Sequence, residues 1–94
     1  MTAPAPLPAK VAIIGAGTIG RGWAALCASA GWECSLFDTD TKVADRAIGE
    51  IGRRARALAA MGRASADTVE RGLRRVRLAP SLLQACGGAE WIIE

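Results

Sequence analysis

The chain has 94 residues, a length that suits one small domain whose stability has little margin. Hydrophobic residues make up 51% of it and the formal net charge is +3, but no stretch approaches the ~20 consecutive apolar residues that a membrane span needs. Its three cysteines, Cys27, Cys34 and Cys86, are odd in number and lack CxxC spacing. This pattern favours buried thiols in a reducing cytoplasm over a disulfide scaffold or a zinc site.

Residues 1–9 are rich in proline and contain no apolar core of signal-peptide length. They also lack the arginines of a mitochondrial presequence. We therefore predict a disordered tail at residues 1–9 and no export signal.

The first predicted strand is VAII, residues 11–14, whose apolar and largely β-branched side chains suit a strand buried on both faces. Gly15 ends this strand, and a helix follows that we expect to finish at Gly31. The second predicted strand is WECSLF, residues 32–37. In the helix between the strands, apolar residues recur at the spacing of one buried face: Ile19, Trp23, Leu26, Cys27 and Ala30.

A longer helix should follow, with Thr39 or Asp40 as its N-cap and Gly62 at its end. Ser65 can cap the next, shorter helix, which carries acidic residues near its positive end. The long helix has one apolar stripe, made of Val43, Ala47, Ile51, Ala55 and Leu58.

Two more strands are predicted near the end of the sequence. Gly72 leads into LRRVRLA, residues 73–79, a strand with an arginine-rich face. Pro80 opens a short helix over residues 80–88, and EWII, residues 90–93, is the fourth strand. Strands that alternate with helices indicate an α/β fold with right-handed crossovers, and we expect a doubly wound parallel sheet of strand order 3-2-1-4.

The sequence GAGTIG matches the GxGxxG pattern of dinucleotide-binding, Rossmann-type folds. It follows a predicted strand, opens a helix and is followed by an acidic residue, Asp38, about 20 residues further on, which is the context that the pattern requires. Gly15 would allow a tight turn, Gly17 the close approach of a pyrophosphate, and Gly20 the close packing of helix on strand. Free N–H groups at the helix start would meet the phosphate charge. The candidate cofactor-binding residues are therefore Gly15, Ala16, Gly17, Thr18, Ile19, Gly20 and Asp38.

Asp38 discriminates between cofactors, because its carboxylate can accept hydrogen bonds from a ribose 2′-hydroxyl and repels a 2′-phosphate. Its neighbours Thr39 and Asp40 supply no arginine, so we expect NAD rather than NADP. The alternative interpretation is that the glycines only make a tight turn and that Asp38 only caps a helix. A phosphate-binding loop of the ATPase type is excluded, because no Gly-Lys-Ser/Thr follows the glycines.

Two other classes of nucleotide-binding protein begin in a similar way. An FAD-binding domain of a flavoprotein shares the glycine pattern, although a glutamate is more usual than an aspartate at the position of Asp38. A methyltransferase commonly has an acidic residue just ahead of the glycines, where this chain has Ile13 and Ile14.

The chain resembles the start of the 3-hydroxyacyl-CoA dehydrogenase superfamily in two stretches, VAIIGAGTIGRGWAALCASAGWECSLFDTD and GAEWIIE. The similarity covers Lys10 to Glu94, and the glycine loop and Asp38 match the family's cofactor positions. IGRGWA and LCASAG are most similar to the L-gulonate 3-dehydrogenase or lambda-crystallin branch, with L-carnitine dehydrogenase and 3-hydroxybutyryl-CoA dehydrogenase next. The resemblance implies that residues 10–94 are the first part of an NAD-binding domain, without its remainder and without the substrate domain.

The resemblance also implies an activity, the oxidation of a secondary alcohol in a 3-hydroxy acid or its CoA thioester. In the family a histidine is the base and a glutamate orients it; both would lie beyond Glu94, and this chain contains no histidine. Glu94 itself matches a family glutamate at the end of the fourth strand. We therefore assign no catalytic residue and no metal site, and we expect the 94 residues alone to be inactive.

Basic residues are concentrated in the second half of the sequence. Between Lys42 and Arg77 there are ten of them against four acidic residues. The simpler interpretation is a solvated helical face. The resemblance implies another, in which a helical hairpin presents four arginines to the nucleotide of CoA: Arg53, Arg54, Arg56 and Arg63. Nucleic-acid binding is disfavoured, because the chain has one Phe, no Tyr and no recognised binding module.

The final run EWII adds an expectation about partners, because an apolar strand there leaves an exposed sheet edge. Such an edge should pair with another chain, aggregate or fray, and we expect a homodimer or another pairing through this edge. The main functional hypothesis is the NAD-binding portion of a cytoplasmic, NAD-dependent dehydrogenase. The alternative is a nucleotide-binding or structural module without catalysis.

Overall fold

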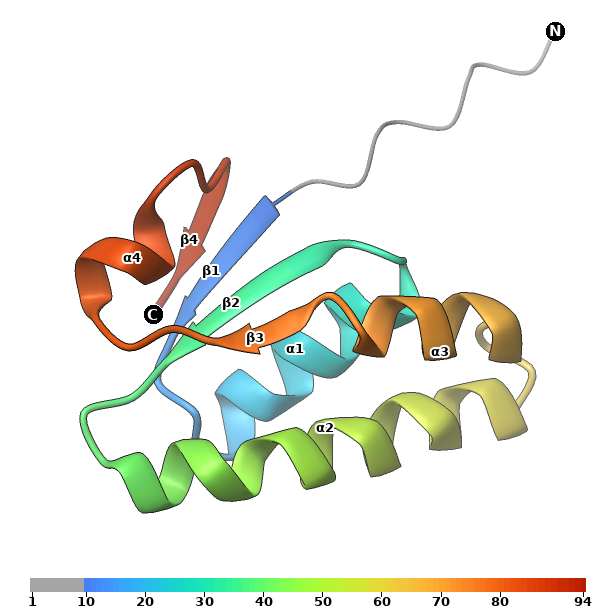
Figure 1. The fold of residues 1–94 in the computed structure, drawn as a ribbon. Coiled ribbons are helices and arrows are strands. Elements are labelled where there is room, and N and C mark those ends of the chain that lie inside the picture. The colour runs from blue at the N-terminus through green and yellow to red at the C-terminus, as the bar shows by residue number, and fades with distance from the viewer. Residues whose placement is uncertain (1–9) are drawn as a thin grey trace, which may run out of the picture.

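The computed structural model describes residues 10–94, so the prediction for residues 1–9 lies outside the described part of the chain. Four strands form one sheet: β1 (Lys10–Ile14), β2 (Glu33–Phe37), β3 (Val76–Leu78) and β4 (Trp91–Ile93). They pair in the order β3-β2-β1-β4, and all three pairs are parallel. The predicted strand order is confirmed (Figure 1).

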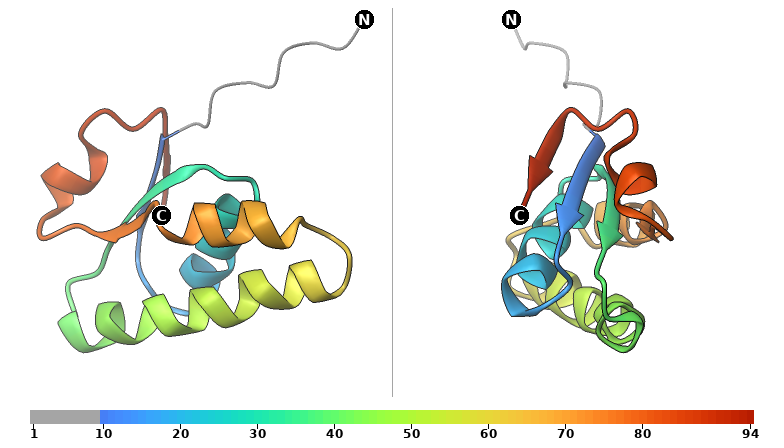
Figure 2. Two further views of the ribbon diagram at one scale, coloured as in Figure 1. Left: turned by 45° about the vertical axis from the view of Figure 1, so that its right-hand side comes forward. Right: turned by 90° about the vertical axis from the view of Figure 1, so that its left-hand side faces the viewer.

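Helices cover both faces of this sheet. They are α1 (Thr18–Ser29), α2 (Thr41–Ala60), α3 (Ala66–Leu73) and α4 (Leu82–Cys86). α1, α2 and α3 pack together on one side, whereas α4 packs on β1 and β2 from the other (Figures 1 and 2). The expected doubly wound α/β arrangement is therefore present. Among residues 10–94, no helix has the combination of length and apolarity that crossing a bilayer requires.

The core lies between α1 and the two central strands. Val11 and Ile13 of β1 and Leu36 of β2 are buried. α1 covers them with small side chains, above all Ala24 and Ala28, which are fully buried. Because these side chains are short, the helix backbone lies close to the strands.

The predicted apolar face of α1 is wrong in part. Cys27 is buried as expected, but Ile19, Trp23 and Leu26 are 76%, 44% and 53% exposed, and Ala30 is the exposed C-cap of the helix. Alanines occupy the side of α1 that meets the sheet, and the larger side chains lie around the helix toward β4. Apolar spacing alone does not separate the two stripes, because both have a helical period.

α2 buries the middle of its predicted apolar stripe. Ala47, Ile51 and Ala55 are fully buried, whereas Val43 and Leu58 are partly exposed. This face packs against α1, so α2 is held to the sheet through α1 rather than by direct contact along its length.

Side-chain caps begin three of the helices. Asp40, one of the two predicted N-caps, accepts hydrogen bonds from two N–H groups in the first turn of α2. Ser65 caps α3 as predicted. α4 begins after Ser81 rather than at Pro80, because the Ser81 hydroxyl accepts a hydrogen bond from the Gln84 N–H at 3.1 Å and so stabilises the start of the helix there.

The prediction that Gly72 leads directly into the third strand is wrong, because Gly72 lies inside α3. A Cβ at this position would overlap the carbonyl group of Ala28, so α3 and α1 touch backbone to backbone. Leu73 completes α3, and the strand that follows is therefore shorter than residues 73–79.

The two edges of the sheet differ in character. β3 carries Arg77, and a charge on an edge strand disfavours pairing with another chain. On β4, Trp91 and Ile92 are 57% and 54% exposed, and no strand among residues 10–94 pairs with the outer edge of β4. The ring of Trp91 packs edge-on against Trp32, with ring centres 5.5 Å apart.

Replacing Gly72 with alanine should destabilise the protein by about 1–3 kcal/mol, because the new methyl group forces α3 away from α1. Gly49 offers a matched control in an exposed part of α2, where the atom nearest to a new Cβ is the end of the Arg53 side chain at 3.8 Å. There the same substitution should stabilise the protein by about 0.5–1 kcal/mol, since alanine favours a helix. Urea unfolding followed by circular dichroism measures both changes. Equal effects of Gly72→Ala and Gly49→Ala would contradict the contact between α3 and α1.

Candidate nucleotide-binding site

The glycine loop joins the end of β1 to the start of α1. Gly15 has a φ of +110°, a conformation that residues with side chains rarely adopt. Its N–H donates a hydrogen bond to the carbonyl oxygen of Phe37 at 2.7 Å, which fixes the loop to the end of β2. The tight turn predicted at Gly15 is confirmed.

Gly17 and Gly20 differ in what surrounds them. Gly17 is the N-cap of α1, no side chain of the described residues caps the helix there, and a Cβ added to Gly17 would have no atom within 4 Å. The first N–H groups of α1 are therefore free to bind an anion, as helix N-termini commonly do. A Cβ at Gly20 would instead overlap the carbonyl group of Gly15, which confirms the close packing predicted for this glycine.

Asp38 follows β2 and lies against the glycine loop. Its Oδ2 accepts a hydrogen bond from the Ala16 N–H at 2.8 Å, and its Oδ1 accepts one from the Asp40 N–H at 2.8 Å. These two bonds, the one from Ala16 first, hold the pKa of the Asp38 carboxyl below its usual value, so the group is ionised at neutral pH. The cap of α2 is Asp40, so Asp38 is not the helix cap that the alternative interpretation required.

Two arginines bind backbone carbonyl groups at the start of α1. Arg21 Nε donates to the Ala16 carbonyl at 2.8 Å, and Arg54 Nη1, from α2, donates to the Thr18 carbonyl at 2.8 Å. Neither arginine belongs to the residues that the GxGxxG motif predicts for the site. The contact of Arg21 could have been expected from the sequence, because side chains in a helix lean toward its N-terminus and so toward Ala16. Arg54 lies 36 residues from Thr18, and no local pattern predicts that contact.

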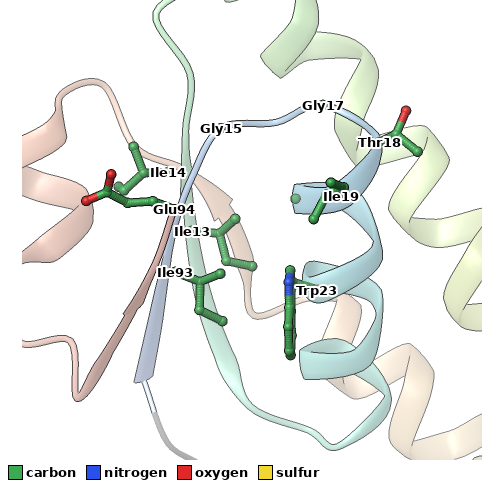
Figure 3. Close-up of a pocket in the computed structure, with 10 residues that line it drawn as sticks. Ile13, Ile14, Gly15, Gly17, Thr18, Ile19, Trp23, Ile93 and Glu94 are labelled. Carbon is green, nitrogen blue, oxygen red and sulfur yellow. The ribbon is translucent and has the colours of Figure 1, made fainter.

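A hollow of about 390 Å³ lies beside the glycine loop, between α1 and β4 (Figure 3). Ile13 and Ile93 from the strands face Ile19 and Trp23 from α1 across it, and the Glu94 side chain points away from them. Glu94 is the only ionisable residue among those that line the hollow. Its walls are therefore mainly apolar, and they offer no histidine-like base.

The arginines of the α2–α3 hairpin are largely engaged in ion pairs. Arg53 and Arg54 both bind Glu50, with N–O distances of 2.5 and 3.2 Å, and Arg56 binds Glu70 at 2.8 Å. Three of the four arginines considered for CoA thus already have acidic partners. This pairing supports the solvated-face interpretation, and the CoA contact stays a prediction.

The cysteines are free thiols, and the two buried ones are unreactive. Burial, with a smaller effect from Cys27, raises the pKa of Cys34 to about 12. Burial also raises the pKa of Cys27, so both thiols remain protonated at neutral pH. Cys86 is partly exposed. Within residues 10–94, no group of three His, Cys, Asp or Glu side chains lies close enough together to hold a metal ion.

The geometry of the loop agrees with comparisons to known proteins. A family profile described as "3-hydroxyacyl-CoA dehydrogenase, NAD binding domain" matches residues 10–94. The 3-hydroxyadipyl-CoA dehydrogenase of Escherichia coli (strain K12) is 36% identical over 84 residues, which are 89% of this chain and 18% of that protein. L-carnitine dehydrogenase/betainyl-CoA thioesterase of Ruegeria pomeroyi is 51% identical over 45 residues, which are 48% of this chain and 9% of that protein.

A solved structure gives the same result at the level of the fold. The 3-hydroxybutyryl-CoA dehydrogenase of Escherichia coli K12 superposes with a TM-score of 0.73 and 30% identity, over 92% of this chain and 18% of that one. The chain thus spans less than about a fifth of the length of each of these relatives. The expected similarity to the L-gulonate 3-dehydrogenase branch stays a prediction.

Replacing Asp38 with asparagine should reduce the free energy of unfolding at pH 7 by about 1 kcal/mol, since two N–H groups lose a charged acceptor at a partly exposed site. The folded-state pKa of Asp38 lies below its unfolded value, so this stabilisation is complete above pH ~4 and is lost as the pH falls through the folded pKa. The difference between Asp38→Asn and the parent should therefore shrink at acid pH. Urea unfolding at pH 7 and near pH 3 measures it, with Asp45→Asn as the control. A difference that is the same at both pH values would contradict these hydrogen bonds.

Proposed function

Because the chain belongs to the 3-hydroxyacyl-CoA dehydrogenase family and matches its NAD-binding domain, we propose that the glycine loop and Asp38 form its NAD site. The ionised Asp38 carboxylate, bound to the Ala16 N–H beside the uncapped start of α1, supports this most strongly. A hydroxyl acceptor next to anion-binding N–H groups is the pair of features that recognises adenosine diphosphate. The residues of the proposed site are Gly15, Ala16, Gly17, Thr18, Ile19, Gly20 and Asp38.

Each part of the cofactor has a place in this proposal. The pyrophosphate lies against the first N–H groups of α1, where the bare backbone of Gly17 allows close approach. The adenosine ribose donates its 2′-hydroxyl to Asp38, which would repel the 2′-phosphate of NADP. The nicotinamide half extends toward the hollow between α1 and β4. This hollow lies beside β1 and β4, where the strand order reverses.

We propose that the reaction served by this site is the oxidation of a secondary alcohol in a 3-hydroxy acid or a 3-hydroxyacyl-CoA. Two relatives are named as dehydrogenases of 3-hydroxyacyl-CoA compounds, which supports the substrate class. NAD, when bound, supplies the hydride acceptor. The 94 residues contain no histidine, so we assign the general base of this reaction to none of them. The chain itself binds and orients the cofactor. The free thiols of Cys27, Cys34 and Cys86 support a reducing compartment such as the cytoplasm.

Replacing Gly17 with alanine should weaken NAD binding by about tenfold or more while leaving the fold intact. The new methyl group meets no protein atom within 4 Å, but it takes the space through which the pyrophosphate approaches the backbone. Isothermal titration calorimetry with NAD, NADP and FAD measures the effect, and the parent should bind NAD most tightly.

Gly49→Ala, on the exposed side of α2, is the control for this experiment and should leave the NAD affinity unchanged. Unchanged affinity in a folded Gly17→Ala variant would exclude the proposed position of the pyrophosphate. Tighter binding of FAD than of NAD by the parent would favour the flavoprotein alternative instead.

We also propose that the outer edge of β4 pairs with a second copy of the chain. Trp91 and Ile92 are exposed there, and no charged residue lies within the strand, in contrast to Arg77 on the opposite edge. Two copies related by a twofold axis would join their β4 strands antiparallel and extend the sheet across the dimer.

Replacing Ile92 with lysine should convert the dimer to a monomer, because a charge on an edge strand opposes pairing. Sedimentation velocity at several protein concentrations measures the oligomeric state. Leu83→Lys is the control, since Leu83 is exposed on α4 and lies outside the β4 strand. A parent chain that remains monomeric at all concentrations would rule out this pairing.

A further inference from the structure

Arg21 lies in the first turns of α1, and its side chain returns to the glycine loop. Its Nε donates to the carbonyl oxygen of Ala16 at 2.8 Å, in a partly buried position. Among residues 10–94, Arg21 forms no ion pair with a carboxylate. The Nε–H of Arg21 therefore donates to an uncharged backbone carbonyl group. This contact does not neutralise the charge of Arg21, so its role must be a different one.

The bond partner of Arg21 is itself bound to Asp38. Ala16 is fully buried, and its N–H donates to Asp38 Oδ2 at 2.8 Å while its carbonyl oxygen accepts from Arg21. The backbone of Ala16 is thus held at both its N–H and its carbonyl group. Three residues form one continuous chain of hydrogen bonds, from the guanidinium of Arg21 through Ala16 to the carboxylate of Asp38.

We propose that Arg21 is a positioning residue that sets the preference for NAD over NADP, because it fixes the Ala16 N–H that orients the Asp38 carboxylate. This inference rests on the proposed function of Asp38 as the acceptor for the ribose 2′-hydroxyl. The Asp38 carboxylate has a second N–H donor, that of Asp40, so loss of Arg21 should loosen its orientation without releasing it. A carboxylate that is less well directed discriminates less between a hydroxyl and a phosphate.

Arg54 offers a matched control. It also donates to a loop carbonyl at 2.8 Å, but that carbonyl belongs to Thr18, which has no bond to Asp38. Arg54 is in addition paired with Glu50. Removal of Arg54 should therefore disturb the start of α1 without affecting the chain of bonds that ends at Asp38.

The direction in which the NAD-over-NADP preference changes distinguishes a positioning role of Arg21 from a purely electrostatic one. NADP carries one more phosphate than NAD, so loss of a nearby positive charge would weaken NADP binding more and raise the preference for NAD. Loss of the orientation of Asp38 has the opposite effect and lowers the preference for NAD. A general loosening of the fold would lower both affinities and leave their ratio unchanged.

The test is to measure dissociation constants for NAD and NADP on the parent, Arg21→Met, Arg21→Lys and Arg54→Met by titration calorimetry. Arg21→Met should lower the NAD-over-NADP preference by about threefold to tenfold, the range expected for one lost hydrogen bond. Arg54→Met should keep the preference of the parent. Arg21→Lys retains a donor and the charge, and it should restore most of the preference.

An unchanged or increased preference in Arg21→Met would overturn the inference. If circular dichroism shows that this variant is unfolded, Arg21→Gln replaces it and is judged by the same criterion. Asp38→Asn separates this inference from the proposed function. If Asp38→Asn abolishes the preference and Arg21→Met does not, only the role of Arg21 fails. If the parent has no preference for NAD, the proposed site fails as well.

Discussion

The close approach of α1 to the sheet is the constraint on which the proposed site depends. Gly20 lies against the carbonyl group of Gly15, and Ala24 and Ala28 occupy the rest of the side that meets the strands. Because none of these residues has a large side chain, the helix begins directly at the carboxyl ends of β1 and β2. The N–H groups of its first turn and the Asp38 carboxylate therefore reach the same edge of the sheet. A larger residue at Gly20 would separate the two halves of the proposed NAD site.

The same close packing explains the apolar surface beside the glycine loop. With small residues against the sheet, the larger ones, such as Ile19 and Trp23, lie on the side of α1 that faces β4. There they meet Ile93 across a hollow that continues from the loop (Figure 3). An apolar surface of this kind can cover a nicotinamide ring, and the neighbouring edge of β4 can be covered by another strand. The binding role and the pairing role proposed for this chain thus have a common structural origin.

Sequence patterns predicted the features that depend on neighbouring residues. The strands follow mainly from short runs of apolar residues between glycines and helices. The cap at Asp40 and the glycine loop with its acidic partner follow from capping and turn chemistry, and the strand order follows from general rules of chain topology. Contacts between distant residues were not predictable in this way. Gly72 resembles a turn glycine, yet it packs on Ala28. The bonds of Arg21 and Arg54 to loop carbonyls depend on side-chain reach, which spacing along the sequence does not specify.

Membership of the 3-hydroxyacyl-CoA dehydrogenase family gives the chain an NAD-binding fold, and we propose that the glycine loop and Asp38 hold the cofactor. An NMR titration of ¹⁵N-labelled chain with NAD tests this claim most directly, because it reports on each backbone amide separately. We expect the largest shift changes at residues 15–20 and at Asp38, with little change along the arginine-rich face of α2. Changes centred on the α2–α3 hairpin, with the glycine loop unaffected, would contradict it.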